Sequence, residues 1–524
     1  MSELHESAMP SPIQDGQDLE RQDTKPDVES RGNIAAHLTQ STIERPQTLL
    51  HETAFVFILC MSQLMCQAAL GQSIAPARII GRSFGTTNPG QLSWFPAAYS
   101  LTVGTFILIA GRLGDLYGHK KLFIGGFAWF ALWSLLAGFS VYSNEVFFDC
   151  CRAFQGIGPA FTLPNAIAIM GRSYSPGTRK QMVFSLNGAM APTGFVIGAV
   201  FSSLLAEFAW WPWAYWITAI VCVVFVVMGH LIIPYTAPPF LDDSVSMWSR
   251  VDALGSITGV SGLVLVNFAW NQAPIVGWTN AYTYVLLIVG IVFLGLFGYI
   301  ESRHAKFPLI PFAVMDGDVG FLLACVAFGW ASFSLWMYYF WQFLENLRNV
   351  SPLLASAQFS PVVMSGFCAA LTTGYILHRV PGSIIMMIAL SAFMVGLILL
   401  ATAPVGQTYW AQTFVSLIIM PWGMDMSFPA ATLLLSNAMP KEHQGVAASL
   451  VSTIVNYSIS IALGVGGTIE GHINDGGKDI LRGYRGAWYL GIGLAGSGVI
   501  LSFLFGFDNW RKARRAGIQD GKMG

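Results

Sequence analysis

The chain has 524 residues; 54% of them are hydrophobic, only 10% are charged, and the formal net charge at neutral pH is −1. This composition is typical of a chain that lies mostly in lipid, and it argues against a water-soluble enzyme. The near-zero net charge gives no indication of a nucleic-acid partner. The seven cysteines all fall within apolar stretches, so we expect no disulfide bond.

The chain begins with a polar segment and continues as a series of apolar stretches. Residues 1–50 are rich in Ser, Gln, Pro, Asp and Glu, which predicts a disordered cytoplasmic tail. Fourteen apolar stretches follow, each about as long as the 20 residues with which an α-helix crosses a bilayer. They lie near 53–74, 93–112, 122–141, 147–171, 182–205, 213–234, 251–271, 281–300, 319–341, 357–378, 383–403, 408–432, 445–467 and 487–507. We therefore expect an all-α integral membrane protein with fourteen transmembrane helices.

Lys and Arg are unevenly distributed over the loops between these spans. With the N-terminus inside, the inner loops hold eleven of these cations and the outer loops hold six. Cytoplasmic loops carry such an excess, and an even number of spans returns the C-terminal tail, residues 508–524, to the same side. We expect both termini to be cytoplasmic, in the plasma membrane or, as the alternative, in the vacuolar membrane.

The second part of the sequence repeats the first. The matched positions are Pro176 with Pro440, Ser185-Leu186 with Ser449-Leu450, Gly158 with Gly423 and Pro164 with Pro429, at offsets of 264 or 265 residues. Chance resemblance between apolar helices is the alternative, but the constant offset favours a duplication. The repeat predicts a six-helix bundle at 51–234, a linker with two extra helices at 235–318, and a second six-helix bundle at 319–507.

Three segments resemble motifs of the major facilitator superfamily. Residues 111–121 read Gly-Arg-Leu-Gly-Asp-Leu-Tyr-Gly-His-Lys-Lys and resemble its loop signature G-x-L-a-D-r-x-G-r-k. Residues 152–158 resemble its R-x-x-q-G-x-g element, and residues 188–198 resemble the G-x-x-x-G-P-x-x-G-G element of its exporters. Fourteen spans narrow the resemblance to the drug:proton antiporter branch. The region that begins at Gly423 is similar to a fungal subgroup of aminotriazole and boron exporters and low-affinity ammonium transporters.

The resemblance implies two functional elements. The loop signature implies a conformational latch formed by Gly111, Arg112, Asp115, Gly118, Lys120 and Lys121. There we expect Asp115 near the N-terminal end of another helix, although a positive-inside bias alone also explains the two lysines. The exporter element implies a helix bend formed by Gly188, Pro192, Gly194 and Gly198. Ala191 stands where this element usually has a glycine, and Gln67 stands near the place where the branch usually has an aspartate.

Ionisable residues within a membrane span are costly and are therefore functional candidates. Asp425, between two prolines of the twelfth span, is our main candidate for proton coupling, with a structural hydrogen-bond acceptor as the alternative. Arg152 is the second candidate, together with Asp149 three residues earlier on the same helix face; an interfacial salt bridge is the alternative. We expect Glu470, at the outer end of the thirteenth span, to be solvated.

Polar and aromatic residues inside the spans are candidates for the lining of a substrate cavity. They are Gln63, Gln67, Asn165, Asn187, Tyr338, Gln342 and Asn456. Such a lining suits a small, moderately polar solute. No cluster of His and Cys has metal-ligand spacing, so we expect no metal and no cofactor.

These observations together predict a secondary active transporter. We expect proton-coupled export of a small organic compound such as a drug, toxin or secondary metabolite by alternating access. A facilitator or importer of ammonium or borate is the alternative that Gln67 favours, and a non-transporting membrane sensor is the alternative of another class. We expect no enzymatic activity and no nucleic-acid partner. The expected partners are the small-molecule substrate, protons and the lipid bilayer, and we expect a monomer.

Overall fold

The fold is seen in a computed structural model that describes residues 48–175, 178–235, 246–305, 308–310, 317–377, 379–438 and 444–520. Every regular element in these ranges is helical. The predicted tail 1–50 lies outside the described residues except at its end, where Thr48 caps the first helix by accepting a hydrogen bond from the amide of His51. The tail predicted at 508–524 continues the last helix as far as Asp520.

The helices follow one another in three groups. The first group, called here the N half, consists of α2 (Leu49–Ile74), α3 (Ala77–Ser83), α4 (Pro89–Tyr117), α5 (His119–Phe139), α6 (Glu145–Ser173), α7 (Thr178–Phe208) and α8 (Pro212–Ile232). The linker holds α9 (Met247–Arg250), α10 (Ala253–Val276) and α11 (Ala281–Arg303). The C half consists of α12 (Gly317–Gln342) with the turn Phe343–Leu347, α13 (Pro352–Phe359), α14 (Pro361–Ile376), α15 (Gly382–Thr402), α16 (Gln412–Ala438), α17 (Gln444–Ile473) and α18 (Ile480–Asp520).

Thirteen helical segments of the described chain are long and apolar enough to cross a membrane. The remaining predicted span, 147–171, lies in α6, which has 29 residues and therefore the necessary length but is not among these thirteen. It packs between α4 and α5 inside the N half. The predicted fold class, an all-α membrane protein with two six-helix bundles and two extra helices, is confirmed.

Equivalent helices pack in equivalent pairs in the two halves. In the N half α5 packs against α6 and α8, and α2 packs against α7; in the C half α15 packs against α16 and α18, and α12 packs against α17. The repeated glycines have the same role. Gly158 lies against the side chain of Phe130, and Gly423 lies against the ring of Phe393. The internal repeat seen in the sequence therefore corresponds to a repeated packing pattern.

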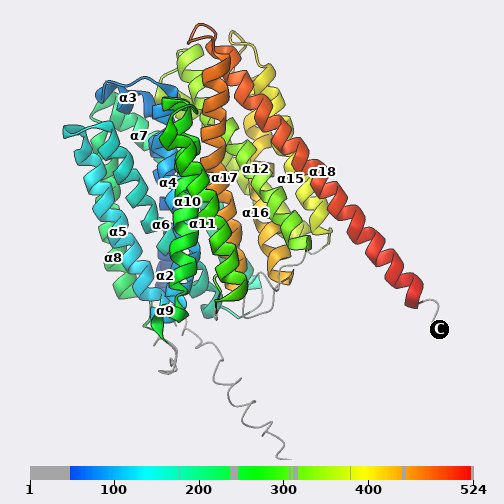
Figure 1. The fold of residues 1–524 in the computed structure, drawn as a ribbon. Coiled ribbons are helices and arrows are strands. Elements are labelled where there is room, and N and C mark those ends of the chain that lie inside the picture. The colour runs from blue at the N-terminus through cyan, green and yellow to red at the C-terminus, as the bar shows by residue number, and fades with distance from the viewer. Residues whose placement is uncertain are drawn as a thin grey trace, which may run out of the picture. The chain divides into compact units, whose positions relative to one another are not determined.

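The two halves meet along two seams, α4 with α17 and α7 with α13 and α14. The first seam is close because Gly104 of α4 lies against Asn456 and Thr453 of α17. Of the extra helices, α10 packs on both α4 and α17, and α11 packs on α10 (Figure 1). Figure 1 also shows α3 and α9 at opposite ends of the bundle. We call the end with α3 the outer end, because the topology predicted from the loops places it outside.

Candidate functional site

Asp425 lies where helices of the two halves meet. It is carried by α16, between Pro421 and Pro429. Its Oδ2 atom faces Gly366 of α14, where an added Cβ atom would lie only 2.7 Å from it. The same Cβ position is 3.1 Å from Pro192 of α7, so the carboxyl group reaches the seam between α7 and α14. Oδ2 is buried and has no hydrogen-bond partner among the described residues.

The residues of the exporter element, 188–198, contact two different helices, α2 and α14. Gly194 and Gly198 face α2, where added Cβ atoms would lie 2.2 Å and 2.1 Å from the carbonyl oxygens of Leu64 and Ala68. Small residues let two membrane helices approach this closely. Pro192 points instead toward the seam with α14, and the Cβ position of Gly188 has no neighbour within 4 Å. The element therefore sets the distance between α2 and α7 and also borders the site of Asp425.

Arg152 is a fully buried cation in the N half. Its guanidinium donates hydrogen bonds to the carbonyl oxygens of Phe95 (3.0 Å) and Ala69 (2.8 Å), to Ser73, and to the side chain of Gln155. It also lies 4.5 Å from the ring centroid of Tyr99, at the distance of a cation–π contact. Arg152 thus joins α6 to α2 and α4.

Asp149 is not the partner of this arginine. No ion pair joins the two side chains within the described part of the chain, and the buried Oδ1 atom of Asp149 has no hydrogen-bond partner there. The interfacial salt bridge, which was the alternative interpretation of this pair, is therefore absent among the described residues. The reason is that the carbonyl groups of α2 and α4, which are distant in sequence, occupy the donors of Arg152.

The latch residue Asp115 is bound within the N half. Its Oδ1 atom lies 2.8 Å from the guanidinium of Arg172, in the last turn of α6, and 3.3 Å from Nε2 of His119, in the first turn of α5. The Nδ1 atom of His119 in turn lies 2.7 Å from Oδ1 of Asn165. We expected Asp115 near a helix N-terminus, and the start of α5 is the one it contacts.

Asn165, which we predicted to line the substrate cavity, belongs to this network. It is completely buried, and its amide donates to the carbonyl oxygen of Phe161 at 2.7 Å while its oxygen contacts His119. All its strong contacts are therefore made to protein groups. Its place in a substrate cavity stays a prediction.

The remaining latch residues hold neighbouring backbone. Arg112 donates to the carbonyl oxygen of Arg250 at 3.0 Å, which ties α4 to the linker. Lys120 donates to the carbonyl oxygens of His230 and Ile233, at the C-terminal end of α8, where a cation is favourable. Lys121 is exposed. Gly118 has φ = +97°, a conformation that glycine adopts readily, and it allows the turn from α4 to α5.

The other predicted cavity residues do not form one cluster. Gln63 and Gln67 are half-buried on one face of α2. Asn187 of α7 lies within hydrogen-bond reach of the thiol of Cys60, and the Asn456 amide donates to its own helix at 2.9 Å. Tyr338 and Gln342 lie farther along, at the outer end, where the Tyr338 hydroxyl donates to the carbonyl oxygen of Pro89.

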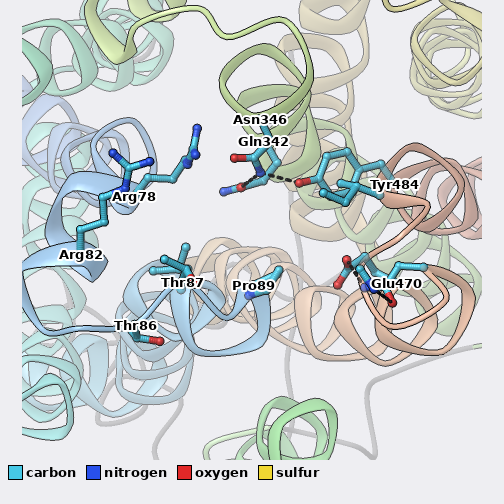
Figure 2. A pocket seen from close by; sticks show the side chains of 13 residues that line it. Arg78, Arg82, Thr86, Thr87, Pro89, Gln342, Asn346, Glu470 and Tyr484 are labelled. Atoms are coloured by element: carbon cyan, nitrogen blue, oxygen red, sulfur yellow. Dashed lines mark hydrogen bonds between the residues drawn. The ribbon is translucent and has the colours of Figure 1, made fainter.

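A cavity of about 230 Å³ opens at the outer end, and most of its charged lining was missed in the sequence. It lies between the N half and the C half; the residues that matter here are Arg78, Arg82, Gln342, Asn346, Glu470 and Tyr484 (Figure 2). We expected Glu470 to be solvated, but only 3% of it is exposed. The excess of Arg in an outer loop, contrary to the usual charge bias, was the signal that could have indicated this site.

Within the described ranges, no group of three or more His, Cys, Asp or Glu side chains is arranged to hold a metal ion.

Residues 56–465 match the sequence model of the Major Facilitator Superfamily. A low affinity ammonium transporter of Saccharomyces cerevisiae is 65% identical over 473 residues, which cover 90% of this chain and 92% of the relative. The efflux pump terJ of Aspergillus terreus is 55% identical over 472 residues, which cover 90% and 91%.

Two further similarities are more distant. The aminotriazole resistance protein of Saccharomyces cerevisiae is 41% identical over 470 residues, which cover 89% of this chain and 86% of the relative. A crystal structure of the peptide transporter POT in complex with sulfate superposes with a TM-score of 0.63 at 14% identity and covers 92% of this chain and 99% of that one. The second similarity concerns the fold alone.

Proposed function

The chain belongs to the Major Facilitator Superfamily and is a multi-pass membrane transporter of a small-molecule substrate, and we propose that it exports small organic compounds in exchange for protons. The names of its relatives, an efflux pump and an aminotriazole resistance protein, support export of such compounds. The sequence contains no Walker A lysine motif, which favours a secondary driving force. We further propose a monomer in the plasma membrane with both termini in the cytoplasm.

The main support for the proposal of proton coupling is the position of Asp425 at the seam of the two halves. In alternating access the halves separate first at one end and then at the other, so water reaches groups at the seam in turn. A carboxylate without a partner is costly in apolar surroundings, whereas water stabilises it. A carboxyl group at this place, with Oδ2 buried and lacking a partner in the described part of the chain, therefore suits a proton carrier.

Arg152 with Asp149 is the second candidate for proton coupling. Arg152 is fully buried and Asp149 is half-buried in the outer part of α6, and the buried Oδ1 atom of Asp149 has no hydrogen-bond partner among the described residues. A rearrangement that brought the carboxylate to the guanidinium would couple charge to the packing of α2 against α6.

The latch is proposed to stabilise one conformation of the transport cycle. Gly111 of α4 lies against Ser449 near the start of α17, so the signature touches the other half. The contacts of Asp115 and Arg112 hold this end of α4 in place, each with a contribution of about 0.3–2 kcal/mol.

Ammonium transport is the second candidate function. The relative that is a low affinity ammonium transporter is 65% identical to this chain, and Gln67 stands near the place where the resembled exporter branch usually has an acid. The two functions predict opposite results when the gene is deleted. Loss of an exporter raises the cellular accumulation of its substrate. Loss of an ammonium importer lowers the uptake of methylammonium, an analogue of ammonium that can be radiolabelled.

The test uses the purified full chain in proteoliposomes. Asp425→Asn, which is nearly isosteric but cannot titrate, is expected to abolish accumulation driven by a pH gradient while exchange of substrate down its own gradient continues. Asp475→Asn, at an exposed loop position, is the matched control and is expected to behave as the native protein. Normal uphill transport by Asp425→Asn would overturn the proposal, and Asp149→Asn would then test the second candidate pair.

A further inference from the structure

We infer that the cavity at the outer end is a binding site for a small solute that carries both an acid group and an amine, such as an ω-amino acid. The cavity lies between the N half and the C half, with arginines on one wall and a glutamate on the other (Figure 2). This inference is independent of the proposed role of Asp425, which lies on a different set of helices.

The wall from the N half is cationic. Arg78 and Arg82 are four residues apart on α3 and therefore on one face of it. Arg78 donates a hydrogen bond to the backbone carbonyl of Glu345 at 2.9 Å, and the side chain of Arg82 is exposed. In the described part of the chain, no carboxylate lies within ion-pair distance of either arginine. The buried carboxyl group of Glu345 interacts electrostatically with both arginines without forming an ion pair, so their guanidinium groups keep donors for an acid group of a ligand.

The wall from the C half is anionic and polar. Glu470 is buried, and its Oε1 atom accepts a hydrogen bond from the amide of Asn474 at 2.9 Å. No cationic side chain of the described residues pairs with it. Beside it, the amide of Asn346 donates to Gln342 at 2.9 Å and to the hydroxyl of Tyr484 at 2.5 Å, which fixes the polar lining.

The two walls select for a ligand with two charges. A simple anion would pair with the arginines but would leave Glu470 buried without a cation. A simple amine would pair with Glu470 but would leave the arginines without an anion. A buried charge that lacks a partner is costly, so a solute with both groups is bound better than either. A cavity of about 230 Å³ limits this solute to roughly the size of an amino acid.

Such a ligand would also act on the transport cycle. The outer ends of the halves are joined by Arg78 to the carbonyl of Glu345, and by the hydroxyl of Tyr338 to the carbonyl of Pro89 at 3.1 Å. The cavity has both walls only while these ends are together. A solute that bridges Arg82 and Glu470 binds this arrangement better than one in which the ends have separated, so it shifts the population toward the closed outer end and slows turnover.

The test measures binding to the purified full chain in lipid nanodiscs. The probes are the unbranched ω-amino acids from glycine to 6-aminohexanoate. Their affinity is measured by calorimetry, and their effect on stability is measured as the midpoint of thermal unfolding. One or two chain lengths are expected to bind and to raise the midpoint. The single-charge analogues of a binding probe, for example butyrate and butylammonium for 4-aminobutyrate, are expected to bind with an affinity that is lower by about tenfold or more.

Variants of residues that line the cavity test whether the probe binds there. Arg82→Gln and Glu470→Gln are each expected to weaken binding about tenfold or more, because each removes a charged partner. Lys478→Gln and Asp475→Asn, exposed residues near the same end that do not line the cavity, are the charge-matched controls and should bind as the native protein. Arg82 is exposed, so its variant remains informative if Glu470→Gln fails to fold. The inference is overturned if no ω-amino acid binds, if single-charge analogues bind equally well, or if Arg82→Gln leaves the affinity unchanged.

Discussion

The imidazole of His119 and the amide of Asn165 are in direct contact, with Nδ1 of the histidine 2.7 Å from Oδ1 of the asparagine. Both residues are buried, and His119 also contacts Asp115. The contact therefore connects the interior of α6 to the turn between α4 and α5.

Asn165→Ala is expected to lower the transport rate without changing the concentration of substrate at half-maximal rate. The variant removes a buried hydrogen-bond partner of His119, which costs about 1–3 kcal/mol, and so weakens the latch but no substrate contact. Initial rates over a range of substrate concentrations in proteoliposomes check this. A raised half-maximal concentration at an unchanged maximal rate would instead support the prediction that Asn165 lines the substrate cavity.

Asp115→Asn is expected to slow transport at least as much as Arg172→Ala, because Asp115 also contacts His119, and the double variant should be no slower than Asp115→Asn alone. The two side chains are 2.8 Å apart and share this contact, so their effects are not additive. Substrate affinity should change little. Additive losses would mean that each residue has a separate partner in the transport cycle, and surface biotinylation controls for the amount of protein inserted.

Gly194→Ala and Gly198→Ala are expected to destabilise the protein by about 1–3 kcal/mol. Their new methyl groups would lie 2.2 Å and 2.1 Å from backbone carbonyl oxygens of α2, which cannot move without separating the two helices. Gly188→Ala on the same helix is the matched control, because its Cβ position has no neighbour within 4 Å. It should be neutral or gain up to about 1 kcal/mol from helix propensity. Thermal unfolding in detergent measures all three, and equal midpoints would refute the close approach of α2 and α7.

Gly366→Ala is expected to impair proton-driven transport although it removes no charge. The added methyl group would lie 2.7 Å from Oδ2 of Asp425 and displace the carboxyl group from the seam. Gly374→Ala, in the same helix α14 and with open space around its Cβ position, is the control. Coupling is measured as the ratio of accumulation with and without a pH gradient. An unchanged ratio in Gly366→Ala would show that the position of the carboxyl group at this seam is unimportant.

The sequence predicted the helices well and their contacts less well, for a physical reason. Spans follow from local composition, because about 20 consecutive apolar residues must cross the bilayer. Contacts depend on which helices lie side by side. Helix spacing correctly places Asp149 and Arg152 on one face of α6, but the guanidinium turns to carbonyl groups of Ala69 and Phe95, which lie on α2 and α4.

Glu470 illustrates the same difference. Its place at the end of a span suggested exposure to water, but α12, α18 and the start of α4 cover this end of α17. The sequence around residue 470 does not predict this burial, because the helices that bury Glu470 are far from it in the chain.

The paired contacts of Gly158 with Phe130 and of Gly423 with Phe393 have a consequence for the symmetry of the protein. At the same offset of 265 residues, the position equivalent to Asp425 is Ala160, which is completely buried and cannot titrate. Close packing at these glycines is thus present in both halves, whereas the acid is present in only one of these two positions. Two halves with the same packing pattern therefore differ in chemistry, and a proton taken up at Asp425 would change the charge of the C half alone.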